Sequence, residues 1–93
     1  MQLDDIFAVS EEVVAREVGG EMVLLNLSSG LYFGLDPVGA RIWELLSEGP
    51  HSLAQLCDVI EAEFDASRER IETDILALAA QLRDQALIAV EAA

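Results

Sequence analysis

The sequence changes its hydrophobic pattern at Asp36-Pro37. Before this pair, short apolar runs are separated by glycine-containing turns, and after it apolar residues recur every three or four positions, the period of a helix. The pair itself favours a helix start, because aspartate accepts hydrogen bonds from free backbone N–H groups and proline at the first helical position loses no needed donor. We therefore predict strands before residue 36 and helices after it.

The part of the chain before Asp36 predicts an antiparallel meander of three strands. Its apolar runs are residues 13–18, 22–27 and 31–35, and each is shorter than a typical helix. Gly19-Gly20 joins the first two runs and readily takes the positive φ values of a two-residue hairpin turn. Ser28-Ser29-Gly30 forms the second turn.

The part after Asp36 predicts three helices. The first ends before Gly49-Pro50, and the second begins at Ser52, where Gln55 completes a capping box. The third runs from the cap residues 65–67 to about residue 85. Residues 86–90 either form a short closing strand or dock on the core. The core stripe of the third helix is predicted to consist of Ile71, Ile75, Leu78 and Leu82.

These elements predict one α+β domain over residues 1–93, with a core over residues 13–88. A three-stranded antiparallel meander packs on three α-helices, in a winged-helix-like arrangement. No apolar run reaches the ~18 residues of a membrane helix. The acidic start of the chain is unlike a secretory signal, and the single cysteine, Cys57, excludes an internal disulfide. We expect a cytoplasmic protein.

The charge of the chain restricts its partners. Eighteen Asp and Glu residues face five Arg and no Lys, which gives a formal net charge of −13. Binding to nucleic acid or to an anionic membrane needs several cations on the protein, so neither is expected. The expected partner is a protein, a peptide or a cationic molecule, and most carboxylates are expected on solvated faces.

Catalytic and metal-binding motifs are absent from the sequence. His51 stands between two helices with no nucleophile or second acid linked to it, and we interpret it as a solvated loop residue. Cys57 lies on the apolar stripe of the second helix, where a buried cysteine behaves as a small hydrophobic residue. The sequence contains no phosphate-binding loop. We predict a protein that is not an enzyme and has no metal or cofactor.

Two other functions fit parts of the pattern. The first is a winged-helix regulator, whose reading helix would be the third, although acidic residues there alternate with Arg68 and Arg70. The second is an acyl or peptidyl carrier protein modified at Ser52, since serine followed by leucine at a helix start resembles a carrier site. Carriers are helical throughout, however, and residues 13–35 read as strands.

The third strand run has an unguarded edge. Sheet edges are usually protected by lysine, proline or a bulge, and residues 31–35 contain neither lysine nor proline. Such an edge is either covered by the chain itself or receives an extended peptide as an additional strand. It would equally allow two copies of the chain to pair as a homodimer. One flank of the third helix, beside its core stripe, would form a groove with this edge: Arg68, Glu72, Leu76, Ala79 and Arg83.

From Val13 to Ile88 the chain resembles the PqqD-like proteins, which are stand-alone recognition elements for the precursors of ribosomally synthesised and post-translationally modified peptides (RiPPs). The resemblance rests on residues 23–36, which read VLLNLSSGLYFGLD, on residues 38–46, which read VGARIWELL, and on Phe64-Asp65. It implies a three-stranded sheet on three helices, and a non-catalytic function in binding the leader segment of a precursor peptide.

The resemblance also implies where the leader binds and which partners take part. The leader would add as a strand to the third β-strand and lie against the third helix. The residues implied for the strand are Leu31, Tyr32, Phe33 and Gly34, and those for the helix are the flank described above, with Ile75 near the floor. The bound leader would be presented to a modifying enzyme or a leader peptidase. Residues 24–32 resemble the PqqD-like proteins associated with lasso peptides more than those that serve pyrroloquinoline quinone synthesis.

Overall fold

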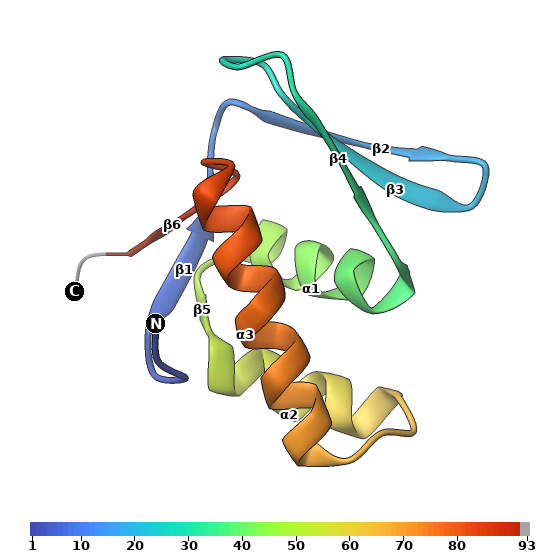
Figure 1. Cartoon of the computed structure of the whole chain (residues 1–93), viewed down its shortest axis with the longest axis vertical. Coiled ribbons are helices and arrows are strands. Elements are labelled where there is room, and N and C mark those ends of the chain that lie inside the picture. The colour runs from blue at the N-terminus through green and yellow to red at the C-terminus, as the bar shows by residue number, and fades with distance from the viewer. Residues whose placement is uncertain (92–93) are drawn as a thin grey trace.

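The structure is a computed structural model that describes residues 1–91, so the last two residues of the predicted domain lie outside the described part. Three helices pack together, and two three-stranded antiparallel sheets lie beside them (Figure 1). The sheet formed between residues 13 and 35 extends away from the helices (Figure 1). The predicted α+β class is confirmed, and the winged-helix-like arrangement stays a prediction.

The predicted meander is confirmed. It consists of β2 (Val13–Val18), β3 (Glu21–Asn26) and β4 (Tyr32–Leu35), in the order β2-β3-β4. The first turn uses Gly19 and Gly20 at φ values of 59° and 86°, and Gly30 takes φ 76° in the second turn. A residue with a Cβ atom adopts such values only with strain, so glycine at these positions determines where the chain reverses.

The three helices begin at the predicted caps. They are α1 (Pro37–Glu48), α2 (Leu53–Glu63) and α3 (Arg68–Asp84). Asp36 Oδ1 accepts a hydrogen bond from Gly39 N at 2.8 Å, and Ser67 Oγ accepts one from Arg70 N at 3.2 Å. The capping box of Ser52 with Gln55 is complete, with both hydrogen bonds formed.

A second sheet was missed in the sequence analysis. It consists of β1 (Ile6–Val9), β5 (His51–Ser52) and β6 (Ile88–Val90), in the order β5-β1-β6. Of the two alternatives for residues 86–90, the short strand is confirmed. Phe7 on β1 is fully buried, so the core begins before the predicted residue 13. Strands of two to four residues have too little local pattern to predict, and they form only because distant segments pair with them.

The core stripe of α3 differs from the prediction by one position. Its buried residues are Ile71, Ile75, Ala79 and Leu82, whereas Leu78 is half-buried. Ala79 borders the same interior space as Leu53 and Leu56 of α2. Leu78 borders this space as well but remains half-buried. No helix within residues 1–91 is long and apolar enough to cross a membrane.

Candidate functional site

A cleft of about 510 Å³ lies where the end of β4 meets α1 and α3. Its floor is apolar, and polar side chains stand among its lining. Strand β4 and the residue that follows it supply one wall, α1 supplies the second and α3 the third. The lining residues are Phe33, Gly34, Leu35, Asp36, Val38, Gly39, Ile42, Asp74, Ile75, Leu78 and Gln81.

Strand β4 borders this cleft with an open edge. It pairs with β3 alone, and no other described strand lies along its second edge. Asn26 N donates to the carbonyl oxygen of Leu31 at 3.0 Å, so the hydrogen-bonding groups of Leu31 face β3. Because these groups alternate between the two sides of an antiparallel strand, Phe33 also bonds to β3. Tyr32 and Gly34 therefore direct their N–H and C=O groups toward the open edge.

The side chains of β4 alternate between two faces of the sheet. Phe33 and Leu35 point toward the cleft and the core, while Tyr32 lies on the outer face with 72% of its surface exposed. Gly34 shares the outer face, and a Cβ atom built on it would meet no atom within 4 Å. Leu31 is 56% exposed and lies near the turn before β4, outside the cleft.

A close approach of α1 to β4 shapes the cleft. Gly39 is buried in the first turn of α1, and a Cβ atom there would lie 3.1 Å from Leu35 Cδ2. A larger residue here would press on the Leu35 side chain, so glycine lets the start of the helix pack closely on the end of the strand. The hydrogen bond from Gly39 N to Asp36 holds the same corner together.

The predicted flank of α3 lies mostly outside this cleft. Of the helix residues expected beside β4, only Ile75 lines it. Ala79 is 4% exposed in the core, and Leu76 packs half-buried against the core. The helical period leaves a flank on each side of the core stripe and contains no signal for which of them meets β4. The cleft-lining residues that were missed on α3 are Asp74, Leu78 and Gln81.

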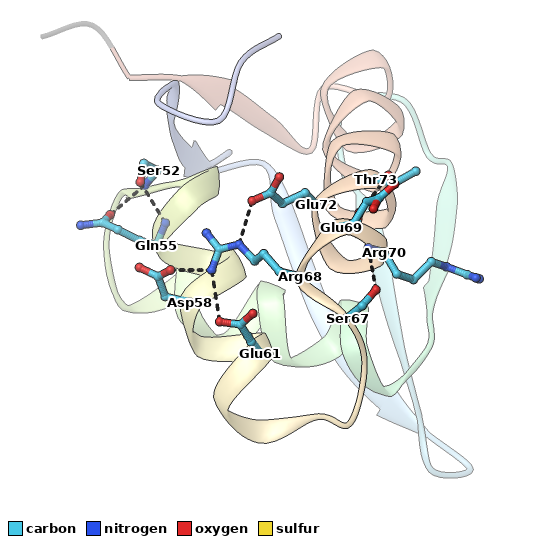
Figure 2. Close-up of polar contacts among 10 residues, drawn as sticks. All are labelled: Ser52, Gln55, Asp58, Glu61, Ser67, Arg68, Glu69, Arg70, Glu72 and Thr73. Carbon is cyan, nitrogen blue, oxygen red and sulfur yellow. Dashed lines mark hydrogen bonds and ion pairs between the residues drawn. The ribbon is translucent and has the colours of Figure 1, made fainter.

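Arg68, Glu72 and Arg83 also lie away from the lining of the cleft. Arg68 forms ion pairs with Asp58 at 2.7 Å, with Glu72 at 2.8 Å and with Glu61 at 3.6 Å, all on the side of α2 (Figure 2). Its hydrogen bonds to Glu72 and Asp58 raise the pKa of the guanidinium, so it stays charged. Arg83 is near Asp84 at 3.9 Å.

The charged groups at the cleft are mainly carboxylates. Asp36 and Asp74 line it, and Asp74 Oδ2 pairs with Arg70 Nε at 3.0 Å. Figure 2 shows that Arg70 and Arg68 extend from opposite sides of α3. The exposed pair of Arg70 with Asp74 contributes little to stability. The lining of the cleft therefore does not include the arginines that the sequence predicted at its border.

The other candidate reactive residues have structural partners. His51 Nδ1 lies 2.8 Å from the carbonyl oxygen of Gly49, and Ser52 Oγ accepts from Gln55 N at 3.1 Å. Cys57 is fully buried, and this burial raises the pKa of its thiol. Among residues 1–91, no three His, Cys, Asp or Glu side chains are grouped to hold a metal ion. The two sheets also distinguish the fold from the all-helical carrier proteins.

Comparison with known proteins identifies relatives over the whole of this site. The family model described as coenzyme PQQ synthesis protein D (PqqD) matches residues 21–88, which include β3, β4 and all three helices. The comparison with curated proteins found no match.

Two solved structures resemble the chain over nearly its full length. One is TbiB1 in complex with the TbiA(beta) leader peptide, with 38% sequence identity and a TM-score of 0.81, covering 92% of this chain and 99% of that one. The other is lasso peptide synthetase B1 complexed with the leader peptide, with 30% identity and a TM-score of 0.77, covering 89% and 96%.

Proposed function

This chain belongs to the PqqD family, and we propose that it binds the leader segment of a ribosomally made precursor peptide as an added strand on β4. The observation that carries the proposal is the open edge of β4 beside an apolar cleft. Both solved relatives described above are complexes with a leader peptide, and they cover 92% and 89% of this chain.

The added strand would use the backbone for affinity and the side chains for selectivity. Tyr32 and Gly34 offer their N–H and C=O groups to the leader, which continues the ladder of the sheet. Leader residues opposite Phe33 and Leu35 then point into the cleft, against Ile75 and Leu78. Leader residues opposite Tyr32 and Gly34 point to the outer face. The expected leader segment therefore has apolar side chains at alternate positions.

The role is that of an adaptor without catalysis. The cleft has an apolar floor, and the cysteine described above lies in the core. The histidine is half-buried on β5, not in the solvated loop that the sequence predicted, so we assign no reaction to this chain. We propose that it presents the bound leader to a modifying enzyme or a leader peptidase in the cytoplasm, where precursor peptides are made. One of the two relatives is a lasso peptide synthetase B1, which favours lasso peptide maturation over pyrroloquinoline quinone synthesis.

Two leucines of α3 provide a matched test of the site. Leu76 and Leu78 are both half-buried and both pack against the core, but only Leu78 lines the cleft. The probe is the fluorescein-labelled N-terminal half of the precursor peptide encoded beside this protein's gene, and its affinity is measured by fluorescence anisotropy. Leu78→Asp should weaken binding about 10- to 100-fold, because it places a carboxylate among apolar contacts.

Leu76→Asp is the control, and it should change the affinity less than about twofold. Circular dichroism and urea unfolding of both variants separate lost binding from lost folding. A larger loss of affinity in Leu76→Asp than in Leu78→Asp would return the site to the other flank of α3. Absence of binding by the unmodified protein would reject the proposed function.

A further inference from the structure

The groove between β4 and α3 continues beyond the cleft, toward the start of β4. Leu31 precedes β4 and continues the inward-facing row of Phe33 and Leu35, because side chains alternate along an extended chain. On α3, Asp84 follows the cleft residue Gln81 by three positions, so the two share a face of the helix. Leu31 and Asp84 both line a second hollow, with a volume of about 370 Å³.

Three segments of the chain form this second hollow, which we call the end hollow. They are the loop before β2, the turn before β4 and the end of α3, and the lining residues are Ser10, Glu12, Asn26, Ser28, Ser29, Leu31, Asp84, Gln85 and Ala86. Asn26 joins two of these segments, since its side chain donates to Gln85 O at 3.0 Å and accepts from Ser28 N at 2.9 Å. Hydrogen bonds between distant segments therefore hold the shape of the end hollow.

We propose that the leader places a lysine or an arginine in the end hollow, two positions along the strand from the apolar residue that packs beside Phe33. This rests on the proposed function, because the basic residue belongs to the strand added to β4. The end hollow would then select among leaders whose apolar residues fit the cleft equally well.

The alternation of the added strand brings this leader residue to the end hollow. Leader side chains opposite Leu35 and Phe33 point inward, and the next inward position lies opposite Leu31. The cleft extends from Leu35 to Phe33, whereas Leu31 belongs to the end hollow. The inward side chain opposite Leu31 therefore leaves the apolar floor and meets a different lining.

The lining of the end hollow suits a long basic side chain. Leu31 is 56% exposed and, with Ala86, offers apolar surface to a methylene stem. Glu12 and Asp84 offer carboxylates to the charged group at its tip. The carboxyl end of α3 adds to this attraction, because the negative end of a helix dipole favours a cation. An acidic leader residue at this position would be repelled.

Both carboxylates are available to a ligand. Within residues 1–91, Glu12 takes part in no ion pair, and the single ion pair of Asp84 is with its neighbour Arg83 at 3.9 Å. Asp74 in the cleft, by contrast, pairs with Arg70 at 3.0 Å. A basic leader residue therefore gains more from the end hollow than from the carboxylate on α3 in the cleft.

The test begins with a phage-displayed library of random peptides, selected on the full-length protein. Peptides whose binding is lost in Leu78→Asp are ligands of the cleft. We expect these peptides to share a lysine or an arginine two positions away from an apolar residue. They are then synthesised with lysine at this position, or with norleucine, which keeps the stem of lysine and removes its charge.

Two double variants show whether the end hollow or the overall charge attracts the lysine. Glu12→Gln with Asp84→Asn removes both carboxylates of the end hollow. Glu17→Gln with Asp65→Asn is the matched control, because it removes the same charge from exposed residues that line neither the cleft nor the end hollow. The control is needed because a chain of net charge −13 attracts any basic peptide.

Affinities of the lysine and norleucine peptides for the three proteins are measured by fluorescence anisotropy at low salt. Norleucine should weaken binding to the unmodified protein and to the control about 2- to 5-fold. For Glu12→Gln with Asp84→Asn, the two peptides should differ less than about 1.5-fold. The preference for lysine should also shrink in ~1 M salt, which screens exposed charges more than ~3 Å apart.

The outcomes separate this inference from the proposed function. Peptides that depend on Leu78 but share no basic residue, or an equal norleucine effect in all three proteins, would overturn the role of the end hollow alone. An absence of peptides that depend on Leu78 would overturn both. A dimer in sedimentation that Glu12→Gln with Asp84→Asn dissociates would assign the end hollow to a second copy of the chain, and would also overturn the inference.

Discussion

The side-chain amide of Asn26 on β3 donates a hydrogen bond to the backbone carbonyl oxygen of Gln85, at the end of α3, at a distance of 3.0 Å. Asn26 is the one buried polar residue among those described, with 4% of its surface exposed. Its Oδ1 atom also accepts from Ser28 N and Ser29 N, at 2.9 and 3.3 Å. Asn26 thus ties the turn before β4 to the residue that caps the end of α3.

Replacement of Asn26 should weaken both the fold and peptide binding. Asn26→Ala leaves three backbone groups without this partner, and we expect a loss of about 1–3 kcal/mol of unfolding free energy in urea. Asn26→Asp keeps an acceptor for the turn but loses the donor to Gln85. Its loss of stability therefore measures the contribution of the hydrogen bond to Gln85 alone. An Asn26→Ala variant as stable as the unmodified protein would show that the tether does not hold the sheet.

The Arg68 cluster should contribute to stability and leave peptide binding unchanged. One third of the Arg68 side chain is exposed, and its ion pairs join α3 to α2. Arg68→Gln removes these pairs. We expect a small loss of stability that decreases at high salt, because solvent screens partly exposed pairs. Leader affinity, measured by anisotropy, should remain within about twofold. An affinity change that depends on leader charge would instead support the flank predicted from the sequence.

Stability should fall in acid partly through Glu63. The hydrogen bond from Arg41, whose Nε lies 2.9 Å from Glu63 Oε1, lowers the pKa of this carboxyl in the folded chain. A lowered folded pKa stabilises the fold above the unfolded pKa of ~4.3, and this contribution disappears as the pH falls through the folded value. NMR titration should show the Glu63 pKa rising in Arg41→Gln. A pKa unaffected by that substitution would contradict the assignment.

Cys57 should resist thiol reagents while the protein is folded. Its side chain is fully buried in α2, and burial raises the pKa of the thiol, so little thiolate forms near neutral pH. Ellman's reagent should react in native buffer only as fast as the chain opens, and it should react rapidly in urea. Ala54→Cys, which introduces a half-buried thiol on the same helix, is a suitable positive control. Immediate labelling of Cys57 in native buffer would contradict its assignment to the core.

Local signals account for the parts of the fold that the sequence predicted. The helix starts at Asp36, Ser52 and Ser67 each depend on a hydrogen bond to a residue three positions away, so a short stretch of sequence contains the whole signal. The turn at Gly19-Gly20 depends on two backbone conformations that only glycine adopts readily. The open edge of β4 followed from the same local pattern, since the order of short strands joined by tight turns leaves the last strand outside.

The second sheet and the lining of the cleft required the tertiary structure. Strand β1 pairs with β5 and β6, which lie more than 40 residues later in the chain, and no local pattern announces such a contact. The helical period of α3 identified an apolar stripe but could not say whether Leu78 or Ala79 lies at its centre. Packing on α2 places Ala79 in the core, and that rotation brings Asp74 and Leu78 to the cleft.

The sequence by itself determined the order of elements, the reversals and the caps, because each depends on neighbours within a few residues. It also determined that a strand with an unguarded edge would stand next to a helical region. Only the tertiary structure decided which side of α3 meets that edge and which charges lie there. A rotation of a helix by one residue changes every contact along its length, and the energy that fixes this rotation comes from packing against segments distant in the chain.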